Sequence, residues 1–216
     1  MTQSHIERKA ASQTQQVGPQ GQAAERQRVL DAAESVTSSD AVPRDEAAER
    51  KGLVLLIGVV LLALLLDQFS KAWIRGNLAP GDAIPMWPGV VHLSHVWNYG
   101  AAWGMLSGQR LVLVGISILV LLGAASMARD FVRRGHLATV GLGLIVGGAI
   151  GNLTDRVLQG YVTDMIDMDT GWQWLRNFPV FNVADSSLTV GVCLLLIHFV
   201  FDQSETANAS QNERVA

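Results

Sequence analysis

Four long apolar runs, separated by polar or charged segments, limit the possible folds of this chain more than any other feature of its sequence. They cover residues 52–74, 111–128, 137–153 and 180–201. A helix needs about 20 mostly apolar residues to cross a bilayer, so each run is long enough for one span. The third run is rich in glycine, which lets neighbouring helices approach closely. We therefore expect a bundle of four transmembrane helices.

The distribution of charge divides the chain into a membrane domain and two polar tails. Residues 51–201 carry 17 charged side chains in 151 positions, whereas the first 50 residues carry 14. A soluble domain has about 25% charged residues, roughly twice the density of this central segment. We expect residues 1–50 to form a disordered polar tail, 51–201 the folded membrane domain and 202–216 a second polar tail.

Composition also excludes several classes of protein. The net charge of −3 leaves no basic surface for nucleic acid, so we expect no such partner. The single cysteine, Cys193, excludes an internal disulfide and any metal centre built from several cysteines. The histidines have no partners at metal-ligand spacing. We therefore expect neither a metal nor a cofactor.

Lysine and arginine in the short loops predict the orientation of the helices. Arg50 and Lys51 precede the first run, and Arg129, Arg133 and Arg134 lie between the second and third runs. The two longer connections carry far fewer basic residues for their length. Because basic loops stay in the cytoplasm, both termini should face the cytoplasm and the two longer connections should face outward.

The outward connections contain more than linker sequence. All six tryptophans lie in these connections or at the outer ends of the runs: Trp73, Trp87, Trp97, Trp103, Trp172 and Trp174. One interpretation is an aromatic belt at the membrane interface. The other is a structured outer subdomain, because residues 90–97 are rich in strand-forming residues and follow a segment punctuated by Pro and Gly.

Four carboxylates gather near the predicted outer face of the membrane, three at the outer ends of the helices and Asp164 in the outer connection, and charge within or beside a span is costly and often functional. They are Asp67, Asp155, Asp164 and Asp185. Asp67 lies four residues before Lys71, so one interpretation is an ion pair that only holds the helix end at the interface. Asp155 precedes Arg156 and could equally be part of a helix-ending ion pair. Asp185 has no basic neighbour within a turn and needs a partner from elsewhere in the fold.

Carboxylate chemistry is what remains after other catalytic patterns are tested. The chain has neither an H-E-x-x-H zinc motif nor a G-x-S-x-G nucleophile turn. Two adjacent carboxylates share one proton, so the ionised one can activate a water while the protonated one polarises a carbonyl. From position alone, Asp155 and Asp164 are equally good candidates for such a pair. An alternative is a small proton- or ion-coupled transporter or channel subunit, although that function favours carboxylates spread across the membrane.

Five short motifs occur in order within residues 51–201 and together resemble the signal peptidase II (lipoprotein signal peptidase) family. They read D-Q-F-S-K at 67–71, N-Y-G-A-A-W at 98–103, G-G-A-I-G-N-L-T-D-R at 147–156, V-T-D-M at 162–165 and F-N-V-A-D at 181–185. Position 103 holds Trp where the family more commonly has Phe. The polar segment 1–50 lies outside the resemblance.

The resemblance implies an all-α integral membrane protein with four transmembrane helices, a small extracytoplasmic β-sheet and a short surface helix. We place the sheet in residues 77–97 and the surface helix in 101–108. A member of this family is a hydrolase, an aspartic endopeptidase that removes signal peptides from diacylglyceryl-modified prolipoproteins. It works without a metal or cofactor, in contact with membrane lipids, in the bacterial plasma membrane, with its active site facing outward. Nothing in the motifs requires more than a monomer.

The resemblance also assigns roles to individual residues. Asp164 and Asp185 correspond to the catalytic pair, which decides between Asp155 and Asp164. The residues expected to bind substrate or shape the site are Asn98, Asn152, Asp155, Arg156, Asn182, Asp67 and Lys71.

Overall fold

The computed structural model describes residues 26–28, 46–168, 170, 172, 175 and 177–215. The disordered tail expected for residues 1–50 lies outside these residues, except at 26–28 and 46–50. Residues 46–50 are helical.

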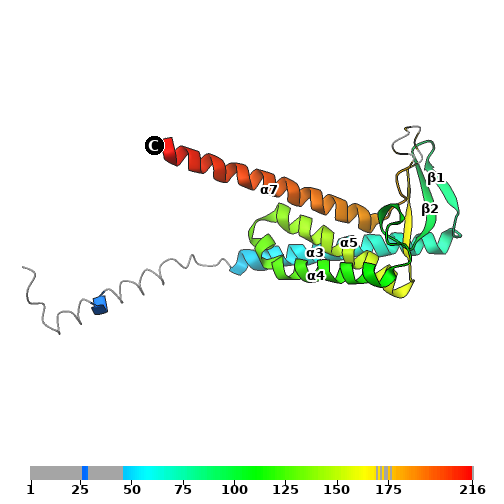
Figure 1. Cartoon of the computed structure of the whole chain (residues 1–216), viewed down its shortest axis with the longest axis horizontal. Coiled ribbons are helices and arrows are strands. Elements are labelled where there is room, and N and C mark those ends of the chain that lie inside the picture. Colours follow the sequence, from blue (N-terminus) through cyan, green and yellow to red (C-terminus); the bar gives the residue numbers. More distant parts are fainter. Residues whose placement is uncertain are drawn as a thin grey trace, which may run out of the picture. The chain divides into compact units, whose positions relative to one another are not determined.

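Four long helices form the framework of the described domain (Figure 1). They are α3 (Glu46–Asn77), α4 (Arg110–Arg133), α5 (His136–Leu158) and α7 (Val183–Val215). Each contains a stretch long and apolar enough to cross a membrane. Large apolar side chains on these helices are widely exposed, as expected for surfaces that contact lipid. The predicted four-helix membrane fold is confirmed.

The helix ends differ from those of the apolar runs for local reasons. α3 extends beyond 52–74, with Glu46 and Glu49 in its first turn and Arg75 in its last, where each charge complements the helix dipole. α7 begins three residues later than the run at 180–201, because Asn182 caps it, and it continues through the segment predicted as a polar tail. Charged residues at the ends of a helix are part of the helix, but they are not included when a helix is predicted from an apolar run.

Helix α5 lies at the centre and packs against the other three long helices. Its glycines make this possible, as the glycine-rich run predicted. A Cβ atom at Gly147 would lie 2.7 Å from the Cβ of Ala63 on α3, closer than side chains tolerate. On the other side, a Cβ at Gly191 of α7 would lie 2.6 Å from the carbonyl oxygen of Gly141. The backbones of α3, α5 and α7 can therefore approach each other closely.

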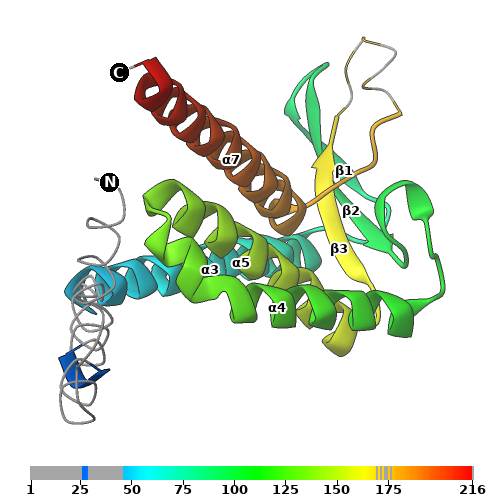
Figure 2. The same ribbon diagram turned by 60° about the vertical axis from the view of Figure 1, so that its left-hand side comes forward.

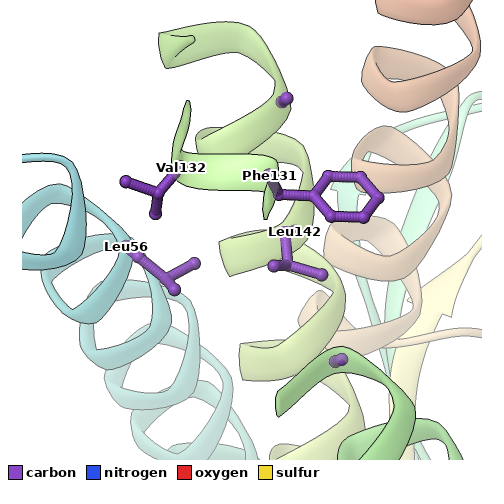
Figure 3. Packing of buried hydrophobic residues seen from close by; sticks show 6 residues of the cluster. Leu56, Phe131, Val132 and Leu142 are labelled. Carbon is purple, nitrogen blue, oxygen red and sulfur yellow. The ribbon is translucent and has the colours of Figure 1, made fainter. Parts of the chain in front are cut away.

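A small apolar core closes the end of the bundle where α4 turns into α5. Leu56 of α3, Phe131 and Val132 of α4 and Leu142 of α5 meet there (Figure 3). Close by, Glu49 of α3 forms an ion pair with Arg133 of α4 at 3.0 Å. The basic residues between the second and third runs, Arg129, Arg133 and Arg134, therefore lie at this end, and the sheet lies at the opposite end (Figure 1).

A three-stranded antiparallel sheet stands at the end of the bundle where α3 ends and α7 begins (Figures 1 and 2). Its strands β1 (Ala83–Trp87), β2 (Val91–Asn98) and β3 (Val162–Asp167) lie in that order. The hairpin β1–β2 covers residues 83–98, one residue beyond the predicted segment 77–97, and the small sheet is confirmed. β3 was not predicted; it pairs Asp164 with Val96, so a proposed catalytic residue lies on a strand.

The remaining outer segment contains a single 3-10 turn, η1 (Ala102–Gly104), inside the region 101–108 where a surface helix was expected. Trp103 in this turn has a positive φ of 54° and is exposed. Trp87 and Trp97 lie on strands, so a structured subdomain carries them. Trp174 lies outside the described residues.

Candidate active site

Asp164 and Asp185 approach each other through Asn182. The Asn182 side-chain amide donates to Asp164 Oδ1 at 2.7 Å. Its backbone N–H donates to Asp185 Oδ2 at 3.2 Å, and its side-chain oxygen accepts the Asp185 N–H at 2.9 Å. The last two bonds form a reciprocal cap on the first turn of α7. One asparagine therefore holds a carboxylate from β3 and a carboxylate from α7 together.

Asp164 is almost fully buried, and its surroundings favour the protonated form. Its second oxygen accepts a hydrogen bond from Asn98 at 2.8 Å, and Asn98 in turn accepts the Gly100 N–H. Burial and then the negative charge of Asp185 raise the pKa of Asp164 to about 7, although the bonds from Asn98 and Asn182 oppose the shift. The pair therefore keeps a proton close to neutral pH.

Asn152 of α5 supports Asp185 from the other side. Its amide nitrogen donates to Asp185 Oδ1 at 2.8 Å. Its oxygen accepts from Lys71 Nζ at 2.8 Å and from the Asn182 amide at 3.3 Å. The partner that Asp185 was predicted to need is thus a pair of asparagines, Asn152 and Asn182, and not a basic residue.

Asp67 and Lys71 form the predicted ion pair, with Nζ and Oδ2 2.9 Å apart and both side chains 0% exposed. They do more than hold a helix end, because Asp67 Oδ1 also accepts the N–H of Ala184 at 2.9 Å. Ala184 directly precedes Asp185. Lys71 Nζ also lies 3.6 Å from Asp155 Oδ2. The lysine thus links the buried carboxylates of Asp67 and Asp155.

Asp155 has the corresponding position on the other side of the pair. Its Oδ2 accepts the N–H of Thr163 at 2.9 Å, and Thr163 directly precedes Asp164. Its Oδ1 pairs with Arg75 at 3.2 Å. The ion pairs of Asp155 therefore run to Lys71 and Arg75 rather than to the neighbouring Arg156. Each proposed catalytic aspartate follows a residue whose N–H is held by a buried carboxylate.

Arg156 turns toward the outer loop. Its guanidinium donates to the Gly100 carbonyl at 3.1 Å and to the Asn152 carbonyl at 3.4 Å. It thereby links the end of α5 to the loop that follows Asn98. All seven residues predicted to shape the site lie in one connected network of contacts with the two aspartates.

A cavity of about 750 Å³ opens beside these residues. Its polar wall contains Asn98, Asn152, Arg156 and Asp185, and its apolar wall comes from α4, α5, α7 and the segment before α7. Asp185 is one of the lining residues, whereas Asp164 is not; Asn98, which lines the cavity, donates a hydrogen bond to Asp164. Within the described part of the chain, no group of three or more His, Cys, Asp or Glu side chains could hold a metal ion.

Comparison with known proteins identifies the family. The sequence profile described as "Signal peptidase (SPase) II" matches residues 59–201, most of the described domain. The chain belongs to the signal peptidase II family. It is therefore an aspartic peptidase and a multi-pass membrane protein, as the five motifs predicted, and the transporter alternative is not favoured.

Relatives and solved structures agree with this family. The lipoprotein signal peptidase of Caulobacter vibrioides is 42% identical over 161 residues, covering 71% of this chain and 91% of that protein. The lipoprotein signal peptidase of Geobacillus thermodenitrificans is 41% identical, covering 70% and 92%. A bacterial membrane enzyme solved by the in meso method at 2.3 Å resolution is 34% identical, with a TM-score of 0.61 over 72% of this chain and 90% of that one.

The signal peptidase II motifs did not reveal two members of the network, Arg75 and Thr163. Arg75 follows Lys71 by four residues and Asp67 by eight, so it lies on the same face of α3. That spacing was the available signal, although Arg75 lies one residue beyond the first apolar run at 52–74 and outside the five motifs. Thr163 stood inside a quoted motif but gave no signal of its own.

Proposed function

We propose that this chain removes signal peptides from diacylglyceryl-modified prolipoproteins, with Asp164 and Asp185 activating a water. The observation that carries the proposal is the contact of Asn182 with both carboxylates, next to the cavity wall on which Asp185 lies. The same aspartates close the motifs at 162–165 and 181–185. Membership of the signal peptidase II family supplies the substrate class.

In the proposed reaction the two carboxylates share one proton. The ionised carboxylate takes a proton from water, whose oxygen attacks the scissile carbonyl carbon. The protonated carboxyl donates its hydrogen bond to the carbonyl oxygen as that oxygen gains negative charge. The C–N bond then breaks as the amine leaves with a proton from the pair, which returns the site to its starting state. The pKa of Asp164, about 7, supports a singly protonated pair near neutral pH.

The other predicted residues have supporting roles in this proposal. Asn98 and Asn152 orient one carboxylate each, at 2.8 Å. Arg156 holds the outer loop at the mouth of the cavity and offers a cation to substrate carbonyls. Asp67, Lys71 and Asp155 hold the backbone next to the pair. These contacts favour a site that is organised before substrate binds.

The wall of the cavity fits a substrate that lies partly in the bilayer. Apolar side chains from the membrane helices, among them Ile116, Val120 and Leu188, form much of it. A lipid-modified peptide can place its acyl chains against such a wall while its backbone reaches the polar side. The cavity and both aspartates come from a single chain, so we propose a working monomer.

We propose that the sheet end faces outward and that both termini face the cytoplasm. The basic residues around Glu49 and Arg133 lie at the opposite end from the sheet, as the positive-inside rule requires. A fluorescent protein that matures only in the cytoplasm, fused after residue 216, should be bright. A dark fusion at normal expression would contradict the orientation.

Asp164→Asn and Asp185→Asn test the catalytic pair. Each variant should lose cleavage of a diacylglyceryl-modified prolipoprotein in detergent by at least about a thousandfold, because neither can complete the acid–base cycle. Asp130→Asn at the far end of α4 is the matched control and should cleave normally. Cleavage by either site variant at the rate of the unchanged protein would refute the assignment.

A further inference from the structure

Strand β3, which carries Asp164, is one of the two edge strands of the sheet, so the N–H groups on its open side need hydrogen-bond partners outside the sheet. At Met165 the partner is the carbonyl of Phe181, at 3.0 Å. At Thr163 the partner is the buried carboxylate of Asp155, at 2.9 Å. The position of Asp164 in space therefore depends on what holds the residues on either side of it.

Arg75 closes a ring of contacts around Thr163. A single guanidinium nitrogen, Nη1, donates to Thr163 Oγ1 at 3.0 Å and to Asp155 Oδ1 at 3.2 Å. The other carboxylate oxygen, Asp155 Oδ2, accepts the Thr163 N–H. Thr163 is 0% exposed and is thus held at two atoms, its backbone nitrogen and its side-chain oxygen.

Holding two atoms of one residue fixes the direction of the next side chain. Successive side chains of a strand point to opposite faces, so Asp164 points away from the face on which Thr163 contacts Arg75. A rotation of the strand about its axis would turn Asp164 away from Asn98 and Asn182. The contacts on one face of β3 therefore set the aim of the carboxylate on the other face. The elements α3, α5 and β3 that take part meet at one end of the bundle (Figure 2).

We propose that Arg75 and Thr163 are positioning residues that aim the Asp164 carboxylate at the reacting carbonyl. The inference rests on the proposed function of Asp164. It assigns a role to two residues that are not among the site residues expected from the resemblance. Neither side chain is among those that line the cavity, and the contacts of both run to Asp155 and to each other rather than to Asp164 itself. Their loss should slow the chemical step and leave substrate binding unchanged, because Asn98, Asn152, Arg156 and Asp185 still line the cavity.

The test compares Thr163→Val with Thr163→Ser in purified full-length protein. Valine keeps the shape and the backbone N–H but removes the hydroxyl, whereas serine keeps the hydroxyl. Thr163→Val should lower kcat roughly tenfold, less than the hundredfold that a displacement of about 1 Å can cost, with an unchanged KM. Thr163→Ser should keep kcat within about threefold. Thr139→Val, which removes another buried hydroxyl at the far end of α5, is the control and should leave kcat unchanged.

Arg75→Met, alone and combined with Thr163→Val, tests whether the two residues act through one contact. The single variant should also lower kcat about tenfold, and the double variant should be no slower than about tenfold, because contacting residues are not additive. Arg75→Lys keeps the charge and should recover part of kcat even if Arg75→Met folds poorly. Arg133→Met removes an exposed arginine that pairs with Glu49, and as the control it should keep kcat.

The outcomes separate this inference from the proposed function. If Asp164→Asn is inactive while Thr163→Val and Arg75→Met keep full kcat, only the positioning role is refuted. A hundredfold loss in the double variant would also refute it, since the residues would then act independently. If Thr163→Ser falls as far as Thr163→Val, the hydroxyl has no role. Active Asp164→Asn protein would refute the proposed function itself.

Discussion

Lys71→Met tests the buried charge network that lies beneath the two aspartates. Lys71 Nζ lies 2.9 Å from Asp67 Oδ2 and 3.6 Å from Asp155 Oδ2, and all three side chains are excluded from solvent. Methionine matches the length of the lysine stem but leaves Asp67 without its cation. Removing one partner of a buried ion pair costs about 3–5 kcal/mol, because the remaining charge is uncompensated.

The surrounding contacts refine this magnitude. Lys71 also donates to the Asn152 oxygen, and an unsatisfied buried acceptor would cost about 1–3 kcal/mol more. The Asn182 amide already donates to that oxygen at 3.3 Å, so most of this second loss is replaced. Asp155 keeps its pair with Arg75 at 3.2 Å. We therefore expect the free energy of unfolding to fall by about 3–5 kcal/mol, the cost of leaving Asp67 unpaired.

Denaturant unfolding in detergent, followed by tryptophan fluorescence, measures the loss. Lys51→Met on the exposed surface of the same helix is the control and should change the free energy of unfolding by less than about 0.5 kcal/mol. The double variant Asp67→Asn/Lys71→Met should be at least about 1 kcal/mol more stable than Lys71→Met alone, because the unpaired charge is gone while an oxygen remains for the Ala184 N–H. A loss under about 1 kcal/mol in Lys71→Met, or a double variant that is less stable than the single, would refute the reasoning.

Two further predictions concern titration and packing. The pKa of Asp164 is raised to about 7, so the pair holds its proton below that pH and loses it above. We therefore expect kcat to fall as pH rises through 7 in a profile from about pH 5 to pH 9. A kcat that stays constant above pH 7 would contradict the shared proton. Gly147→Val should lower the free energy of unfolding by about 1–3 kcal/mol or more, since no space exists for its side chain against α3. Gly58→Val, where a Cβ meets nothing within 4 Å, is the matched control, and an equal loss at both positions would show that helix propensity and not packing decides the effect.

The length and apolar composition of the four runs were enough to predict the four helices, because a helix that crosses lipid must be apolar over about 20 residues. Strand β3 could not be predicted in this way. It is six residues long, carries two aspartates and pairs with β2, which lies more than 60 residues earlier in the chain. This pairing depends on where α5 ends in the folded structure, and the local sequence of β3 does not indicate that position.

The site shows the same division between local and distant information. The Asp67–Lys71 pair follows from a four-residue spacing on one helix and was predicted. The bonds that the N–H groups of Ala184 and Thr163 donate to Asp67 and Asp155 join elements that are adjacent only after folding. The motifs named most participants, but the contact of each carboxylate with the backbone before an aspartate required coordinates.

The reciprocal cap between Asn182 and Asp185 has a consequence for how many molecules are ready to react at any moment. Two hydrogen bonds between Asn182 and Asp185 hold the first turn of α7, and one of them also holds the Asp185 carboxylate, so fraying of this helix end releases one of the contacts that place the carboxylate. Every 1.4 kcal/mol in the free energy of that local opening changes the frayed fraction about tenfold. The rate of amide hydrogen exchange at Asp185 thus reports the fraction of molecules with an intact helix end, without any substrate present. It distinguishes a variant whose chemical step is slow from one whose site is seldom intact.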